Sequence, residues 1–151
     1  MKIQNDKEFR SALDSLSIGQ QRALGALFVQ RVQHLCDNPL INKAIDVAKS
    51  AALESVEIDE VFKEVRALST QTYTACGGDA CWPEQAAHFV ATAAKACLTP
   101  EEQIGLKTNL AWKTAIQARL ANNCEMIEQD SGEVNSEAQK QYVLTEEFLA
   151  A

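Results

Sequence analysis

Residues 38–53 read NPLINKAIDVAKSAAL, and they carry the clearest structural pattern in the chain. Pro39 stands where the first turn of a helix tolerates a missing backbone donor, and Asp37 or Asn38 precedes it as a cap. We therefore predict a helix that runs to about Leu53. Its apolar and alanine residues recur at steps of three and four, which places them on one helical face: Ile41, Ala44, Ile45, Ala48, Ala51 and Ala52.

The same periodicity continues on both sides of this stretch, and no segment alternates as a strand does. Further helices are expected at about 7–16, 17–36, 56–73, 83–97, 99–128 and 136–149, with Gly105 or Asn109 as an interruption of the longest one. The caps that we expect follow known patterns: Asp6, Ser17 with Gln20, Thr99 with Glu102, and Ser136 with Gln139.

These patterns predict an all-α fold in one domain over residues 1–151. It is a single compact array of six or seven antiparallel helices joined by short loops. Residues 1–16 form a short N-terminal helix, and residues 76–82, which read CGGDACW, form a glycine-rich central loop.

Charge and cysteine content narrow the function classes. The chain has 21 acidic and 14 basic residues, and its net charge of −7 argues against binding to nucleic acid or to an anionic membrane. The start, MKIQNDKEFR, is charged, and no long apolar run follows, so we expect neither a signal peptide nor a membrane span. Five cysteines at irregular spacing, without an export signal, indicate reduced thiols in a cytoplasmic protein.

Cysteine and histidine residues are the first candidates for chemistry. Cys76 and Cys81 have four residues between them rather than the two of redox and zinc motifs, although a helix start near Cys81 would lower its thiol pKa. His88 follows seven residues later. His34 and Cys36 are two apart and so point to different faces of a helix. We expect no metal and no cofactor; the nearest candidates for a metal site are Cys76, Cys81 and His88.

Catalytic motifs are absent from the sequence. No Glu-x-x-His, Gly-x-Gly-x-x-Gly, phosphate loop or serine nucleophile elbow occurs, and the acidic residues gather at helix starts and in the C-terminal part, where they suit capping and solvation. We therefore expect no enzyme and no catalytic residue. The two tryptophans, Trp82 and Trp112, are the candidates for contact with a partner, with a core or groove position as the simpler interpretation.

Four segments resemble the alanine-rich helical immunity proteins of bacterial polymorphic toxin systems. They are NPLINKAIDVAKSAAL, PEQAAHFVATAAKACL, AWKTAIQARLANNCEMIE and SEAQKQYVLTEEFL, together covering about residues 38–149. The likeness lies in the alanine spacing and in an ending read as Glu137, Gln141, Leu144 or Thr145, and Phe148 or Leu149. It implies an all-helical protein that protects by binding a cognate toxin, and it assigns no functional residue.

Our leading hypothesis is a non-enzymatic, cytoplasmic interaction protein whose acidic surface binds a basic protein partner. A thiol or metal protein that uses the Cys76–Cys81 loop is one alternative. Another is a helical bundle that holds an apolar ligand between Phe28, Phe89 and Trp112. If the apolar stripe of residues 142–149 is not covered within the chain, it predicts a homodimer.

Overall fold

The computed structural model describes residues 2–50, 55–76 and 81–151, apart from the side chains of Ser55 and Cys76. Within these residues it contains seven α-helices and no strand, which confirms the all-α prediction. The helices are α1 (Asp6–Asp14), α2 (Ile18–Val32), α3 (Leu40–Lys49), α4 (Ser55–Cys76), α5 (Trp82–Cys97), α6 (Leu110–Glu128) and α7 (Glu137–Ala150), with short 3-10 turns η1 (Gln33–Leu35) and η2 (Glu101–Gln103).

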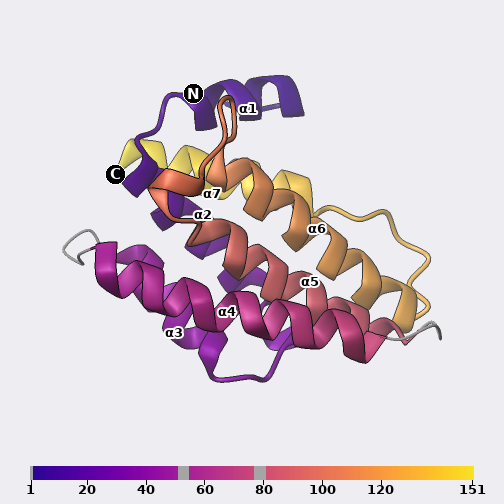
Figure 1. Cartoon of the computed structure of the whole chain (residues 1–151). Coiled ribbons are helices and arrows are strands. Elements are labelled where there is room, and N and C mark those ends of the chain that lie inside the picture. Colours follow the sequence, from indigo (N-terminus) through magenta and orange to yellow (C-terminus); the bar gives the residue numbers. More distant parts are fainter. Residues whose placement is uncertain (1, 51–54, 77–80) are drawn as a thin grey trace.

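The long helices form a layered array. Helices α4, α5 and α6 lie side by side, with α2, α3 and α7 behind them and α1 across the top (Figure 1). All alanines of α5 and α6 except Ala87 are almost fully buried, which lets these two helix axes approach closely; among them are Ala91, Ala93, Ala94, Ala111, Ala115 and Ala118. The alanine periodicity in the sequence therefore marks the centre of the core.

Gly25 lies on α2 where this helix meets α5 and α6. A Cβ atom placed there would lie 3.2 Å from the Cys97 sulfur and 3.3 Å from the Thr114 hydroxyl oxygen. Such distances are tighter than ordinary van der Waals contact, so the glycine serves helix packing at this position.

The first helix starts one residue earlier than expected, and the last helix starts as expected after Ser136 but without the expected side-chain cap; local hydrogen bonding explains both differences. Asn5, rather than Asp6, caps α1, because its side chain accepts a hydrogen bond from the Glu8 backbone. At α7 the Glu137 backbone donates to the side chain of Asn135, and Ser136 makes no side-chain cap. The capping box of Ser17 with Gln20 is confirmed.

The long helix expected over 99–128 is interrupted at Asn109, which was one of the two predicted positions. Thr99 donates its hydroxyl back to carbonyl groups of α5, so it does not cap a new helix, and only η2 forms. Asn109 caps α6 and also donates to the Leu13 carbonyl oxygen, while Gln21 accepts from the Leu110 backbone. These long-range hydrogen bonds fix the interruption at Asn109.

Three further expectations are settled by helix bounds or fall outside the described residues. The helix expected to reach residue 36 ends at Val32 and continues as η1. The helix expected to run to about Leu53 is too long, because α3 ends at Lys49 and Ser50 has extended backbone, with φ of −85° and ψ of 115°; residues 51–53 lie outside the described residues. The central loop expected over residues 76–82 falls largely on the undescribed residues 77–80. Among the helices that are described, none is both long and apolar enough to cross a membrane.

Candidate functional site

A network of polar and aromatic side chains joins α1, α6 and α7, and we call it the α1 junction. Both terminal nitrogens of Arg119 donate to the carboxylate of Asp6, at 3.0 and 2.9 Å, and the Tyr142 hydroxyl donates to the same carboxylate at 2.7 Å. The hydrogen bonds from Arg119 lower the pKa of Asp6, whereas burial raises the pKa of Tyr142. Each polar group has a partner within the chain, so the junction is structural.

Trp112 belongs to this junction. Its ring lies 6.0 Å from that of Phe9, and the guanidinium groups of Arg10 and Arg119 lie 4.7 and 5.6 Å from its centroid. Phe9 is fully buried and also contacts Phe28, at 6.0 Å between ring centroids. Phe9 therefore fills the space between two of the three rings that were expected to enclose an apolar ligand.

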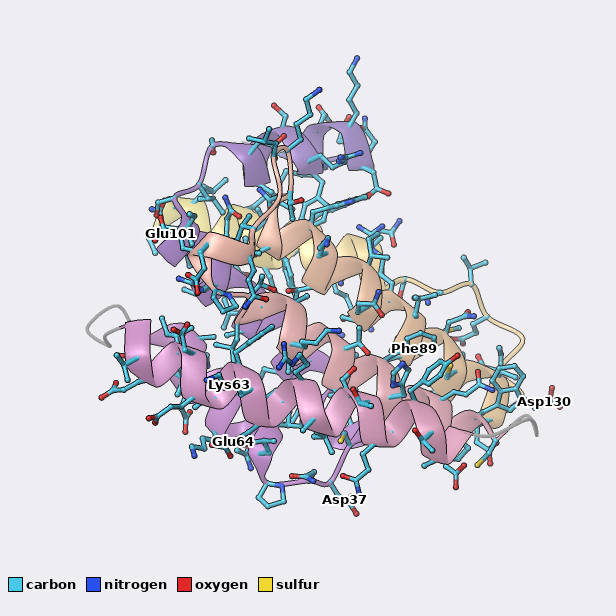
Figure 2. The ribbon with its side chains drawn as sticks, viewed as in Figure 1. Asp37, Lys63, Glu64, Phe89, Glu101 and Asp130 are labelled. Atoms are coloured by element: carbon cyan, nitrogen blue, oxygen red, sulfur yellow. The ribbon has the colours of Figure 1, made fainter. Side chains whose placement is uncertain are left out.

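The third of those rings, Phe89, lies elsewhere. It is half-buried on α5 and contacts His88 at 5.8 Å between ring centroids, on the side of the array that α4 and α6 border (Figure 2). The expectation of a ligand held between Phe28, Phe89 and Trp112 thus finds no support, because α1 supplies the aromatic side chain that fills the core.

His88 is held by polar partners on α4 and α5. Its Nδ1 lies 3.0 Å from the Thr72 hydroxyl oxygen, and burial lowers its pKa. Cys81 precedes α5 and is half-buried, seven residues before His88, while the side chain of Cys76 lies outside the described residues. In the part of the chain that the structure describes, no three His, Cys, Asp or Glu side chains are grouped to hold a metal ion.

Two other described cysteines are poorly suited to thiol chemistry, whereas the alternative that uses Cys76 with Cys81 stays a prediction, because the side chain of Cys76 is not described. Cys97 is fully enclosed, which raises its pKa to about 12, and burial also raises the pKa of Cys36. A thiol with a raised pKa is a poor nucleophile at neutral pH, because the thiolate is the reactive form.

The apolar stripe of the C-terminal helix α7 faces the core of the same chain. Tyr142 is buried, and Leu144, Phe148 and Leu149 pack against the core. Val143 alone of these residues is largely exposed, at 52%. The stripe is therefore only partly covered within the chain, and the homodimer stays a prediction.

An ion pair between the partly exposed Arg31 and the buried Glu137 anchors α7 to α2. Arg31 donates two hydrogen bonds of 3.0 Å to Glu137, whose side chain is only 2% exposed. The bond to Glu137 raises the pKa of Arg31. As at the α1 junction, a buried charge meets its opposite within the chain.

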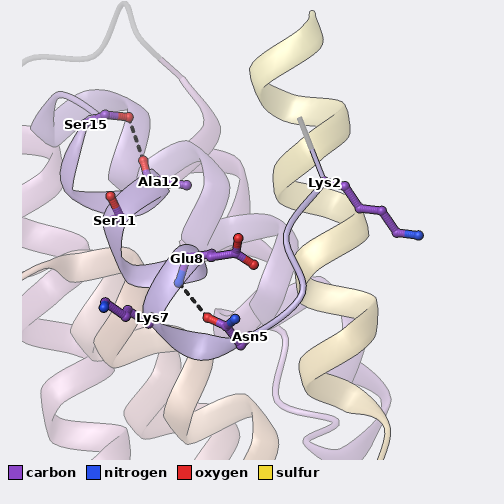
Figure 3. Close-up of a pocket in the computed structure, with 7 residues that line it drawn as sticks. All are labelled: Lys2, Asn5, Lys7, Glu8, Ser11, Ala12 and Ser15. Carbon is purple, nitrogen blue, oxygen red and sulfur yellow. Dashed lines mark hydrogen bonds between the residues drawn. The ribbon is translucent and has the colours of Figure 1, made fainter.

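The outer face of α1 carries an open hollow of about 620 Å³ (Figure 3). Its polar groups serve the helix itself: Asn5 accepts from the Glu8 backbone, and the Ser15 hydroxyl donates to the Ala12 carbonyl oxygen. Lys2 extends away from the other lining residues (Figure 3). No group of polar side chains converges there, so we do not regard it as a binding site.

A smaller pocket of about 270 Å³ lies where η1, the start of α5 and the end of α6 meet. Six of its lining residues combine an aromatic ring, a histidine and carboxylates: His34, Trp82, Pro83, Glu125, Glu128 and Gln129. His34 Nε2 lies 2.8 Å from the carboxylate of Glu125. We call this the Trp82 pocket, and it brings together aromatic and acidic groups from three segments.

Charge is distributed unevenly around this pocket. The described residues 67–76, 81–94 and 120–136 contain five acidic residues and no lysine or arginine. These stretches supply the start of α5 and the end of α6, together with the loop that carries Asp130 (Figure 2). We call this part of the molecule the acidic end; Glu101 lies at the opposite end of the array (Figure 2).

Two acids of the acidic end, Glu128 and Asp130, stand where they cost stability, whereas the neighbouring Glu125 has His34 as a partner. Glu125 and Glu128 lie in the last turn of α6, whose carbonyl groups make that terminus partially negative, and no basic residue is present there. Asp130 has φ of +51°, in the left-handed region that glycine adopts more easily. Local preferences violated together in this way are typical of a functional site.

Sequence reasoning found only part of this site. It predicted Trp82 as a candidate for contact with a partner and considered His34 only for metal binding. It assigned Glu125 and Glu128 to capping and solvation. The sequence signal that was available is the absence of lysine and arginine from residues 120–136. The fold then brings this stretch next to Trp82 and η1.

Fold and site together define an all-helical protein with an acidic pocket at one end of the array. No protein-family model matches the chain, and no curated protein or solved structure is significantly similar to it.

Proposed function

We propose that this protein is a non-catalytic interaction module that binds a basic protein partner through its acidic end. The observation that carries the proposal is the position of Glu128 and Asp130 at the C-terminus of α6, next to Glu125, which His34 contacts, in a stretch, 120–136, without lysine or arginine. Charges that cost stability in the free protein are accounted for if a partner neutralises them.

An immunity role is the specific form of this function that we favour. The resemblance of four segments to helical immunity proteins supports it, and the basic partner would then be a toxin encoded with this protein. We place the interaction in the cytoplasm, in keeping with the charged start and the cysteine usage of the sequence.

Site-specific crosslinking in the native host tests the proposal. The photoreactive residue p-benzoylphenylalanine replaces Gln129, which lines the Trp82 pocket, or Glu102, which lies next to Glu101 at the opposite end. We expect one polypeptide of high isoelectric point to crosslink from position 129 and not from position 102.

The crosslinked partner is then purified and its affinity measured by calorimetry. The double variant Glu128→Gln with Glu133→Gln neutralises two acids of the acidic end and should weaken binding about tenfold or more. The control, Glu101→Gln with Glu102→Gln, changes the total charge equally and should weaken binding less than about twofold. The two should differ because charge–charge attraction is local at physiological ionic strength. Equal losses from both pairs, or crosslinking from both positions alike, would contradict the proposal.

The immunity role has its own readout. Co-expression with the identified partner should restore the growth of cells that the partner inhibits, and the variant with Glu128→Gln and Glu133→Gln should protect less well. A partner that does not affect growth would remove the immunity role and leave the binding function in place.

A further inference from the structure

Resting on the function proposed above, we propose that the Trp82 pocket receives an arginine side chain of the basic partner. The pocket is a concavity of about 270 Å³ with an indole, an imidazole and two carboxylates on its walls. An arginine suits such walls because its planar guanidinium stacks on aromatic rings and donates to carboxylates at the same time.

The elements around the pocket fix these groups in place. Trp82 and Pro83 begin α5, and Glu125 and Glu128 follow one another on α6 at a spacing of three, which puts both on one face of that helix. The imidazole of His34, on η1, lies 2.8 Å from one oxygen of Glu125 and so orients that carboxylate at the pocket wall. The ligand groups are therefore held on three separate elements before any partner arrives.

The charge of the site selects a cation. The last turn of α6 adds the negative end of its helix dipole to the carboxylates of Glu125 and Glu128. The start of α5, which by itself favours anions, already has Glu84 in its first turn. An anionic ligand would thus meet two carboxylates and a negative helix end, whereas a guanidinium would be attracted by all three.

The chain itself contains an example of the same recognition. Arg119 lies 5.6 Å from the centroid of Trp112, and its two terminal nitrogens bind the Asp6 carboxylate at 3.0 and 2.9 Å. At the α1 junction one chain supplies ring, carboxylate and arginine together. At the Trp82 pocket the ring and the carboxylates are present, and the stretches 67–94 and 120–136 contain no arginine or lysine.

Fluorine NMR on protein labelled with 5-fluorotryptophan tests this assignment without a destabilising substitution. The chain has two tryptophans, so two signals are expected, and Trp112 serves as the internal control. The probes are three short blocked peptides in which glycine alternates with arginine, lysine or citrulline. We expect the arginine peptide to shift the Trp82 signal saturably, the lysine peptide to bind at least threefold more weakly, and the citrulline peptide to have no effect.

Matched variants separate the pocket from the overall charge of the chain. Glu125→Gln and Glu128→Gln should each weaken the arginine peptide about fivefold to tenfold, through loss of a charge-assisted hydrogen bond. Glu101→Gln, which changes the net charge by the same amount at the opposite end, should weaken it less than twofold.

A Trp82 signal that does not move with the arginine peptide overturns the pocket assignment, and so does an equal loss of affinity in Glu128→Gln and Glu101→Gln. Neither result touches the proposed function if crosslinking from position 129 still captures a basic partner whose affinity depends on the acidic end. Conversely, a saturable shift of Trp82 without any such partner would retain the arginine pocket and refute the interaction module.

Discussion

Asp6 and Glu128 are both acidic residues at helix ends, but their surroundings are opposite. Asp6 is the first residue of α1, at the partially positive end of that helix, and it binds Arg119 and Tyr142. Glu128 is the last residue of α6, at a partially negative end, and the described part of the chain gives it no hydrogen bond or ion pair. The comparison suggests that charge at the α1 junction serves the fold, and that charge at the acidic end serves something outside it.

The largest effect is expected from removal of the ring at the centre of the α1 junction. Phe9→Ala leaves a cavity among three aromatic neighbours, and the free energy of unfolding should fall by about 4 kcal/mol. Urea denaturation measures this loss. Leu106→Ala is the control, because that side chain is 98% exposed and should change stability by less than about 0.5 kcal/mol. A loss below 1 kcal/mol for Phe9→Ala would mean that α1 is not part of the folded core.

The next largest loss of stability is expected from the ion pair between Arg31 and Glu137. Arg31→Ala leaves the carboxylate of Glu137 buried without its cation, and we expect a loss of about 3 kcal/mol in chemical denaturation. Lys43→Ala removes one partner of an exposed pair, Lys43 with Glu64, and should cost less than about 0.5 kcal/mol. Similar losses in the two variants would show that burial does not distinguish these pairs.

A smaller, pH-dependent effect is expected at Asp6. Its pKa is lowered in the folded protein, chiefly by Arg119, so its stabilising contribution is present above the ordinary aspartate pKa and is lost as the pH falls through the lowered value. Asp6→Asn should therefore cost about 1 kcal/mol at pH 7, a modest figure because the side chain is half-exposed.

Unfolding curves recorded from pH 7 down to pH 2.5 test this expectation. The difference between wild type and Asp6→Asn should close in acid, whereas Glu101→Gln should show no comparable difference at neutral pH. A difference that stays constant with pH would mean that the carboxylate charge does not act through Arg119.

The smallest effect has the opposite sign and belongs to the acidic end. Glu128→Gln removes a negative charge from the negative end of α6, so the free energy of unfolding should rise by about 0.3–1 kcal/mol. Thermal unfolding at low ionic strength is the sensitive measurement, and the gain should shrink as salt is added. If Glu128→Gln instead destabilises the protein, the carboxylate has a structural role and the contrast with Asp6 no longer holds.

Helical periodicity was sufficient to predict the fold class, because alanine and apolar residues repeat locally at steps of three and four. The break before α6 was predicted only as an alternative, since it depends on hydrogen bonds that Asn109 and the Leu110 backbone donate to residues about 90 positions away. Such long-range contacts leave no recognisable local pattern in the sequence.

The Trp82 pocket could not be predicted from the sequence for the same reason. His34, Trp82 and Glu128 are about 50 positions apart, and each has an ordinary local interpretation as an exposed histidine, a packing tryptophan or a solvated acid. The role of Phe9 was also missed, because periodicity shows that a face is apolar without showing which other face covers it. Only the packing of α1 against α6 and α7 assigns that ring to the centre of the core.

The close approach at Gly25 has a consequence for the ancestry of this protein. Many exposed loop residues can be replaced freely over evolution, but a Cβ atom at Gly25 would crowd the Cys97 sulfur and the Thr114 hydroxyl, so these side chains of α5 and α6 would have to shift. A distant relative with the same arrangement should therefore retain glycine at this position, together with small side chains where Cys97 and Thr114 stand. These three sites form a more discriminating signature of common descent than the abundant alanines, which any helical protein can share.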